Sequence, residues 1–353
     1  MTEFVCVIMA GGAGTRFWPL SHEKLPKQFL KLVADTSLLQ ESFNRARTLC
    51  PAERILVFTN ADYTGIVQEQ LPEIPAANIF GEPLRKDTAA AVAWASLVCQ
   101  KRFGDCVIVT LTADHWIQPV DSFRQALADF VWGAANSQGI YTMGIAPTYP
   151  ATGYGYLELG SDLHPERPLP HYEVKRFKEK PDLATAQHYV ESGSYLWNSG
   201  MFAWKSQTIL SQLQTNLPRH LEILEPVCES QGPLMLEAFQ ALERISIDFA
   251  VLEKAPEVFC LRPSFEWSDL GGWLALEPFL SDLGQGNSAR GQLHALDSSG
   301  NLIFCSDEAE QVALVGVSDL VVVRVPGKTL ILPRARGEDI KKLLERFPEL
   351  NKS

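Results

Sequence analysis

An apolar segment that runs straight into a glycine-rich loop is the feature that most constrains this sequence. Residues 4–9 are apolar throughout, as is typical of a strand that is buried on both faces of a sheet. Gly11, Gly12 and Gly14 follow at once, and a residue without a Cβ permits backbone angles and close approaches that other residues block. We therefore expect a buried strand that ends in a loop whose amide groups can face an anion.

Positive charge accompanies this loop. Residues 16–31 hold four cations against one acid, Glu23; the cations are Arg16, Lys24, Lys27 and Lys31. Arg suits bidentate contacts with phosphate, whereas Lys acts as a mobile point charge. A tight turn that uses glycine for geometry alone is the simpler interpretation of the glycines, but the cations favour a polyphosphate site.

Two familiar phosphate-binding loops do not fit this segment. A Walker-type loop requires Gly-Lys followed by Ser or Thr, and the dinucleotide fingerprint requires Gly-x-Gly-x-x-Gly. Residues 12–14 read Gly-Ala-Gly here and are followed by Thr-Arg-Phe. The pattern therefore predicts a third kind of phosphate loop, and it argues against a nicotinamide-dependent oxidoreductase.

The composition of the chain excludes several classes of protein. Its 353 residues are 46% hydrophobic and 21% charged, which is ordinary for a soluble globular protein. The net charge of -11 disfavours general nucleic-acid binding, and no apolar run approaches the roughly 20 residues of a membrane helix. The seven cysteines are odd in number and scattered, so neither a disulfide framework nor a thiolate zinc site is indicated. We expect a cytoplasmic protein that binds neither nucleic acid nor membrane.

The order of apolar segments predicts an α/β fold. Helix candidates at 37–49 and 88–103 alternate with strand candidates, which are residues 4–9, 54–59, 107–112 and 140–145. Such alternation implies a largely parallel sheet with helices on both faces, in which ligands bind at the carboxyl ends of the strands. A more strand-rich part of the same domain follows at 153–159, 174–177 and 195–204.

Glycine and polar residues interrupt the pattern at 282–290, and this interruption predicts a domain boundary. Runs rich in β-branched residues follow at 320–325 and 329–332, and a helix candidate closes the chain at 338–347. We therefore expect a catalytic domain at 1–285 and a small β-rich domain at 286–353. A short left-handed β-helix is one architecture that fits the second domain.

Two aspartates are candidate metal ligands. Asp114 follows the apolar run 107–112, and Asp269 lies in a turn before Gly271 and Gly272. Carboxylates that converge from two segments would suit Mg²⁺ held between phosphate oxygens. A helix cap at Asp114 and an Asx-turn at Asp269 are the structural alternatives. His115 has no partner at metal-ligand spacing, so we expect it to be structural.

Polar groups suited to a sugar phosphate lie at the ends of the later strands. Glu179 can accept hydrogen bonds from sugar hydroxyls, Lys180 can bind a phosphate, and Asn198 can pair with a hydroxyl in both directions. Gly155 would let a pyranose ring approach the backbone. A solvated charged edge, a plain β-turn and a β-bulge are the respective alternatives.

A turn that leads into a helix N-terminus contains Glu82, Pro83, Asp87 and Thr88. Its polar groups could contact the edge of a base, and the helix end favours negative charge. A simple helix cap explains Asp87 or Thr88 equally well.

Taken together, these motifs resemble the sugar-1-phosphate nucleotidyltransferases, and within them the branch that transfers a guanylyl group. The resemblance spans most of residues 4–275 and rests on residues 11–21, 25–29, 82–83, 86–89, 114–115, 151–156, 177, 179–181, 197–200 and 267–271. It implies a Rossmann-like nucleotidyltransferase core with a mixed, mainly parallel sheet flanked by helices. The implied reaction is transfer of GMP from GTP to α-D-mannose 1-phosphate, with release of pyrophosphate and with assistance by Mg²⁺.

The resemblance also implies roles for the candidate residues. The nucleotide-binding set is Gly11, Gly12, Gly14, Thr15, Glu82, Pro83, Asp87 and Thr88. The groups implied in catalysis are Arg16, Lys27 and Lys180, and the metal ligands are Asp114 and Asp269. The residues implied in binding the sugar phosphate are Gly155, Glu179, Lys180 and Asn198. A homodimer through the β-rich tail is a weaker implication.

Two alternatives to this function stay open at the level of sequence. The substrate could be another hexose 1-phosphate, because mannose and glucose differ at one stereocentre. The chain could also be a catalytically silent regulatory subunit that binds a nucleotide sugar, because a fold can persist after its catalytic activity is lost.

Overall fold

The computed structural model describes residues 2–12, 14–230 and 232–352. The chain divides into two compact units, which we call the sheet unit and the loop unit. The sheet unit comprises Met1–Gly11, Ser42–Ala113 and Ile117–Trp267, and the loop unit comprises Gly12–Glu41, Asp114–Trp116 and Ser268–Ser353. The expected boundary at residue 285 therefore lies inside the loop unit.

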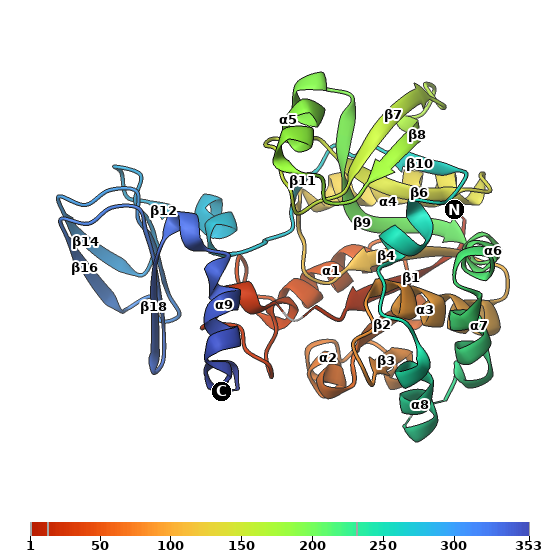
Figure 1. Cartoon of the computed structure of the whole chain (residues 1–353), viewed down its shortest axis with the longest axis horizontal. Helices are drawn as coiled ribbons and strands as arrows, with labels where there is room; N and C mark the ends of the chain where they lie inside the picture. The colour runs from red at the N-terminus through yellow and green to blue at the C-terminus, as the bar shows by residue number, and fades with distance from the viewer. Residues whose placement is uncertain (1, 13, 231, 353) are drawn as a thin grey trace. The chain divides into compact units, whose positions relative to one another are not determined.

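One mixed sheet forms the centre of the sheet unit (Figure 1), and its strands lie in the order β3-β2-β1-β4-β9-β6-β10-β8-β7. Their bounds are β1 Phe4–Ala10, β2 Ile55–Asn60, β3 Ile79–Glu82, β4 Val107–Thr112, β6 Ile140–Ile145, β7 Tyr156–Asp162, β8 His171–Lys178, β9 Tyr195–Lys205 and β10 Val258–Leu261. Two short strands, β5 Trp116–Gln118 and β11 Glu266–Ser268, lie where the chain passes between the units.

Parallel pairing is confined to part of this sheet. Strands β1 to β4 pair in parallel, with Cys6 opposite Ile55 and Val109, and β10 pairs in parallel with β6. The pairs of β9 with β4, β6 and β7, and of β8 with β7 and β10, are antiparallel. The chain runs from β7 to β8 without a crossover helix, so these two strands can pair antiparallel. The expected mixed α/β sheet is confirmed, with fewer parallel pairs than expected.

Helices accompany the strands of this sheet. They are α1 Leu38–Arg47, α2 Thr64–Gln70, α3 Thr88–Phe103, α4 Val120–Ala135, α5 Leu183–Ser192, α6 Ser206–Asn216, α7 Pro218–Leu224, α8 Pro233–Ala241 and a π-helical turn at Asp248–Leu252. Among the described residues, none of the helices is long and apolar enough to cross a membrane.

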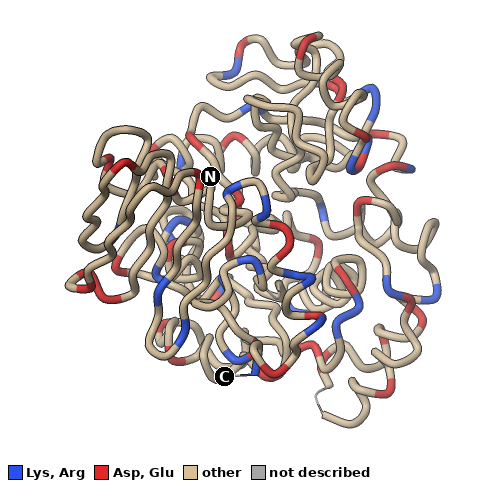
Figure 2. Tube along the Cα trace, turned by 60° about the vertical axis from the view of Figure 1, so that its left-hand side comes forward, with Lys and Arg blue, Asp and Glu red and all other residues tan. Residues whose placement is uncertain are grey.

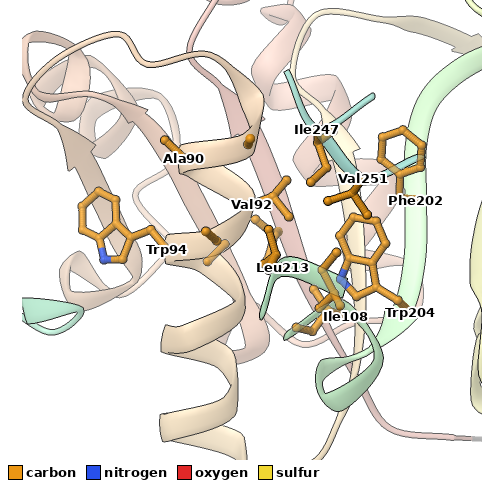
Figure 3. Close-up of a cluster of buried hydrophobic side chains, with 14 of the residues drawn as sticks. Ala90, Val92, Trp94, Ile108, Phe202, Trp204, Leu213, Ile247 and Val251 are labelled. Atoms are coloured by element: carbon orange, nitrogen blue, oxygen red, sulfur yellow. The ribbon is translucent and has the colours of Figure 1, made fainter. Parts of the chain in front are cut away.

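Helix α3 is the most deeply buried of these helices. Figure 3 shows its Ala90, Val92 and Trp94 in the core cluster that also contains Ile108 of β4 and Trp204 of β9. The indole of Trp94 donates to the carbonyl of Cys228 at 2.7 Å, which satisfies a polar group that burial would otherwise penalise. This packing fixes the carboxyl ends of β1 and β4, from which the glycine loop and Asp114 follow along the chain.

The loop unit has a core of its own. Its strands and helix are β12 Ser281–Asp282, β13 Ser288–Arg290, β14 Gln292–Leu296, β15 Leu302–Cys305, β16 Gln311–Val315, β17 Leu320–Val325, β18 Lys328–Pro333 and α9 Asp339–Arg346. Phe17 packs edge-on against Trp273 with ring centroids 5.1 Å apart, and Trp273 packs against Phe304 at 4.9 Å. The Trp273 indole donates to the Trp18 carbonyl, and the Trp18 indole donates to the Leu350 carbonyl. Aromatic packing thus joins the segment after the glycine loop to the end of the chain.

The C-terminal strands stack as parallel coils. Strands β13, β15 and β17 pair in parallel in one sheet. In another, β14 pairs in parallel with β16 (Figure 1). Buried Asn287 and Asn301 stack between coils, with Asn301 Nδ2 2.9 Å from Asn287 Oδ1. Each amide also pairs with backbone groups, at Ser298 and Leu320. The β-rich tail that the sequence predicts is confirmed, and its parallel coils are those of a short β-helix.

Charged residues of both signs are interspersed along the chain (Figure 2). All seven cysteines are free thiols. Because the two signs of charge are mixed along the chain, an anion needs a local group of cations. The segment after the glycine loop, residues 16–31, supplies such a group.

Candidate active site

The glycine loop is fixed to the cationic segment that follows it. Gly14 has a φ of +57°, and a Cβ at this position would lie 2.5 Å from the backbone nitrogen of Lys27, so only glycine fits without strain. Ser21 Oγ donates to the Gly14 carbonyl at 2.7 Å, and Gln28 Nε2 donates to the Gly12 carbonyl at 3.1 Å. These contacts therefore hold the glycine loop against the segment that carries Lys27. Ala13 lies outside the described residues.

A pocket of about 230 Å³ lies in the loop unit beside this loop. Its lining comes from separate stretches of the chain, namely Gly14, Thr15, Arg16, Phe17, Lys27, Asp114, His115, Asp269, Leu270, Gly271 and Lys341. The structure thus brings Gly14, Thr15, Arg16 and Lys27 together with Asp114 and Asp269, whereas Gly11 and Gly12 do not line this pocket. His115, which we expected to be structural, is buried but also lines the pocket.

Lys27 lies at the centre of the electrostatics of this pocket. Its side chain is only 8% exposed, and its Nζ lies 2.9 Å from Asp114 Oδ2. The same ammonium donates to the backbone carbonyl of Asp269. Partial burial of Asp114 tends to raise its pKa, but the charge and hydrogen bond of Lys27, together with His115 and a backbone hydrogen bond, outweigh this effect and hold the pKa below its usual value. Asp114 is therefore ionised and paired with the candidate catalytic lysine.

Arg16 is held at the mouth of the pocket. Its Nε lies 2.9 Å from Glu338 Oε1, and its Nη1 donates to the Gly271 carbonyl at 3.4 Å. Glu338 immediately precedes α9. A carboxylate near the C-terminal end of the chain therefore forms an ion pair with the guanidinium of Arg16. No motif in the sequence marks Glu338 as a functional residue, because an acid at the start of a helix is an ordinary feature.

The two candidate metal ligands line the same pocket. Within the described residues, no three side chains from His, Cys, Asp and Glu gather as a complete metal site. Asp269 lies in a turn in which the Ser268 hydroxyl accepts from the Leu270 amide at 3.1 Å. Two carboxylates that leave further positions to phosphate oxygens match the hard-oxygen preference of Mg²⁺, so the donor set fits such an ion.

A second polar cluster lies within the sheet unit, around Asn198 of β9. Asn198 Oδ1 accepts from Thr142 Oγ1 at 2.7 Å, and Asn198 Nδ2 donates to Asp248 Oδ1 at 3.1 Å. The backbone amide of Asn198 donates to the Gly155 carbonyl at 2.8 Å. Lys180, which has a φ of +45°, donates to Glu179. The four candidate sugar-phosphate residues thus occur in the same part of the sheet unit.

Close packing explains the glycine at position 155. A Cβ there would lie 2.6 Å from Glu179 Oε2 and 2.9 Å from the ring of Phe177. Glu179 is itself buried, so its carboxylate has little room to move aside. Gly155 therefore gives the Glu179 carboxylate its place in the cluster.

Asp248 belongs to the same cluster and was missed in the sequence analysis. Burial raises the pKa of its carboxyl to about 7, and the negative charge of Glu179 adds to the effect. It opens a π-helical turn, a feature that is frequent at functional sites. In the sequence it stands between Ile247 and Phe249 with no motif to mark it.

The remaining candidates lie around the start of α3. Glu82 ends β3, and burial raises the pKa of its carboxyl to about 8, with a further contribution from Asp87. Asp87 accepts from the Thr88 amide at 2.9 Å, and Thr88 Oγ1 accepts from the Ile247 amide at 2.8 Å. Asp87 therefore caps the helix, as one alternative proposed, while Glu82 has no such structural role among the described contacts. Pro83 follows Glu82 in the turn.

Comparison with known families identifies the class of this protein. The model of the family described as nucleotidyl transferase matches residues 5–285. A second model, described as the MannoseP isomerase/GMP-like beta-helix domain, matches residues 291–347. The chain belongs to the nucleotidyl transferase family.

Individual relatives narrow the comparison. The mannose-1-phosphate guanylyltransferase of Escherichia coli K12 is 35% identical over 97% of this chain and 73% of its own length. The xanthan biosynthesis protein XanB of Xanthomonas campestris (strain B100) is 34% identical over 100% of this chain and 75% of its own length. A crystal structure described as mannose-1-phosphate geranyltransferase from Thermus thermophilus superposes with a TM-score of 0.87. It is 33% identical and covers 99% of this chain and 100% of its own.

Proposed function

We propose that this protein transfers GMP from GTP to α-D-mannose 1-phosphate and releases pyrophosphate and GDP-mannose. The guanylyltransferase among its relatives supports the substrates. The observation that carries the chemistry is the pocket of the loop unit, in which Gly14, Arg16 and Lys27 stand beside Asp114 and Asp269.

The reaction needs positioning and charge rather than a protein nucleophile. A phosphate oxygen of mannose 1-phosphate is already anionic; it forms a bond to the α-phosphorus of GTP while the bond from this phosphorus to the α–β bridging oxygen breaks. The main obstacle is repulsion between anions, which fixed cations and amide groups reduce. Arg16 and Lys27 stabilise the negative charge that develops at the α-phosphate. The triphosphate is bound by the loop residues Gly11, Gly12, Gly14 and Thr15.

Asp114 and Asp269 would hold Mg²⁺, which neutralises charge between phosphate oxygens when it is bound. Lys27 supports this arrangement because its pairing keeps Asp114 ionised. The metal requirement and its identity are part of this proposal.

The cluster of the sheet unit would bind the sugar phosphate. Lys180 carries an exposed ammonium for the phosphate, while Glu179 and Asn198 have oxygen and nitrogen atoms for hexose hydroxyls. Gly155 is buried against Glu179 and Phe177, so it would act by giving the Glu179 carboxylate its place and not by contact of its backbone with the ring. Asp248 would orient the side chain of Asn198 through their hydrogen bond.

Guanine would be recognised at the turn before α3. The N1–H and N2–H₂ groups of guanine are donors, and the ionised form of Glu82 accepts from both. The raised pKa of Glu82 means that binding of guanine at neutral pH would release a proton. Pro83, Asp87 and Thr88 would shape the turn around the base.

The proposal extends to organisation and location. A catalytic domain at 1–285 and a β-rich domain at 286–353 agree with the two family models. The free thiols suit the cytoplasm. Exposed Leu296 and Val315 lie opposite each other on β14 and β16, and this apolar pair supports a homodimer through the tail.

The function is tested by supplying each of four nucleoside triphosphates with mannose 1-phosphate or glucose 1-phosphate and Mg²⁺. Pyrophosphate release and the nucleotide sugar are measured together. The proposal expects the highest kcat/KM for GTP with mannose 1-phosphate. A clear preference for another pair would contradict the substrates, and tight binding of GDP-mannose without any turnover would indicate the silent subunit.

A further inference from the structure

Helix α9 brings one more cation to the pocket of the loop unit. Lys341 lines this pocket together with the glycine loop, Arg16 and Lys27. The helix is anchored in the core by Ile340 and Leu344, which are 2% and 7% exposed. The helix also packs against Thr15–Phe17. Packing therefore sets the position of the Lys341 backbone beside the phosphate loop.

Glu338 pairs with both exposed cations at this mouth of the pocket. Its carboxylate lies 2.9 Å from Arg16 Nε and 3.6 Å from Lys341 Nζ. Glu338 is 72% exposed, and Arg16 and Lys341 are 38% and 46% exposed. Ion pairs with this degree of exposure contribute little to stability, because solvent screens the two charges. A polyphosphate with several negative charges can therefore displace the single carboxylate.

The cations that line this pocket differ in their access to a bound phosphate. Lys27 is buried and paired with Asp114, which leaves Arg16 and Lys341 as the exposed cations that line this pocket among the described residues. The leaving pyrophosphate gains negative charge as its bond to the α-phosphorus breaks. A cation at the solvent side of the pocket would stabilise that charge.

We propose that Lys341 binds the phosphates that leave as pyrophosphate, and that Glu338 is an internal counter-ion which occupies Arg16 and Lys341 until those phosphates displace it. This proposal rests on the proposed function for the identity of the polyphosphate. It makes the C-terminal helix a part of the catalytic machinery, whereas the resemblance implied only a homodimer contact for the tail.

The chain contains a matched control for Lys341. Lys342 is the next residue of the same helix and carries the same charge, but it pairs with Asp339 at 2.7 Å and does not line this pocket. Lys341→Met and Lys342→Met therefore change net charge equally on one helix. Lys341→Arg retains the cation and serves as a rescue variant.

The test measures binding of inorganic pyrophosphate to the full-length protein by calorimetry, together with KM for GTP and for mannose 1-phosphate. Lys341→Met should weaken pyrophosphate binding and raise KM for GTP about tenfold, a loss of ~1.4 kcal/mol, with KM for mannose 1-phosphate unchanged. Lys342→Met and Lys341→Arg should stay within about twofold of the wild type. Glu338→Gln should tighten pyrophosphate binding several-fold, because it removes the competing carboxylate.

Equal effects of Lys341→Met and Lys342→Met would overturn this proposal, as would weaker pyrophosphate binding in Glu338→Gln. Thermal melting of each variant separates loss of folding from loss of binding, and Lys341→Arg tests the charge if Lys341→Met is unstable. Failure of the proposed function has a different signature: the wild type would form no GDP-mannose, while its affinity for pyrophosphate and the ranking of the variants would still report on Lys341.

Discussion

The Nζ of Lys27 lies 2.9 Å from Asp114 Oδ2, although 87 positions separate the two residues in the sequence. The lysine follows the glycine loop, and the aspartate follows β4, so the pair joins the segment with the phosphate-binding candidates to one of the two metal-binding candidates. Because Lys27 is buried, this contact fixes where its charge can act. We regard the pair as the electrostatic centre of the proposed reaction.

Replacement of Lys27 by methionine should reduce kcat for GDP-mannose formation by about 100-fold or more, since it removes a fixed cation from the transition state. It should also raise the pKa of Asp114, whose main stabilising charge is lost. Steady-state kinetics measures the first effect. Lys31→Met is the matched control, because Lys31 lies in the same segment but is exposed. Similar kinetics for the two variants would contradict the central role of Lys27.

Two glycine substitutions should separate the nucleotide from the sugar phosphate. Gly14→Ala introduces a Cβ against the Lys27 backbone at a positive φ, so it should raise KM for GTP about tenfold or more. Gly155→Ala introduces a Cβ against Glu179 and should raise KM for mannose 1-phosphate instead. Each variant serves as the control for the other, and Gly65→Ala, which faces open space, controls for loss of a glycine. If both variants impair the same substrate, the division of roles is wrong.

Lys180→Met should raise KM for mannose 1-phosphate about tenfold or more and leave KM for GTP nearly unchanged, because only one substrate would contact this ammonium. Lys178→Met provides the comparison: Lys178 is exposed at the end of β8, two residues away. Initial rates over a grid of both substrate concentrations give the two constants. Equal losses for both substrates would count against a sugar-phosphate role.

Asp248 should make stability depend on pH. An unfolded Asp ionises near pH 3.9, whereas burial raises the folded pKa of Asp248 to about 7. Between these values the folded state holds a proton that the unfolded state has lost, so the contribution of this group to stability falls as pH rises from about 4 to 7 and is level above. Asp248→Asn cannot ionise and retains an oxygen for Asn198.

Denaturant unfolding at pH 5 and pH 8 measures this contribution. Relative to the wild type, Asp248→Asn should gain about 1–3 kcal/mol between the two pH values. Asp62→Asn, at an exposed position, should show no such gain. A constant difference between Asp248→Asn and the wild type would mean that Asp248 is ionised throughout this range.

Local patterns predicted much of the fold. The apolar runs at 107–112, 140–145 and 320–325 coincide with β4, β6 and β17, because a buried strand needs continuous apolar residues. Asp87 caps α3 as the sequence suggested. The mixed order of the sheet was harder to predict in detail, since the insertion of β9 between β4 and β6 depends on contacts between distant segments.

The contacts that complete the pocket were beyond sequence reasoning for the same reason. Glu338 and Arg16 are 322 residues apart, and nothing in either local pattern indicates the other. Asp248 acquires its raised pKa from burial, which no neighbouring residue in the sequence reveals. The packing of Phe17, Trp273 and Phe304 likewise joins the glycine loop to the tail across the expected domain boundary.

The stereochemistry of transfer tests the central claim most directly. A single diastereomer of GTP in which sulfur replaces one non-bridging oxygen of the α-phosphate, so that the α-phosphorus is a stereocentre, is converted with mannose 1-phosphate, and the configuration at phosphorus in the resulting GDP-mannose thio-analogue is determined. A single displacement, in which Arg16, Lys27 and the glycine loop act by charge and position alone, predicts inversion at phosphorus. Retention would require a guanylylated enzyme as an intermediate and would contradict the account.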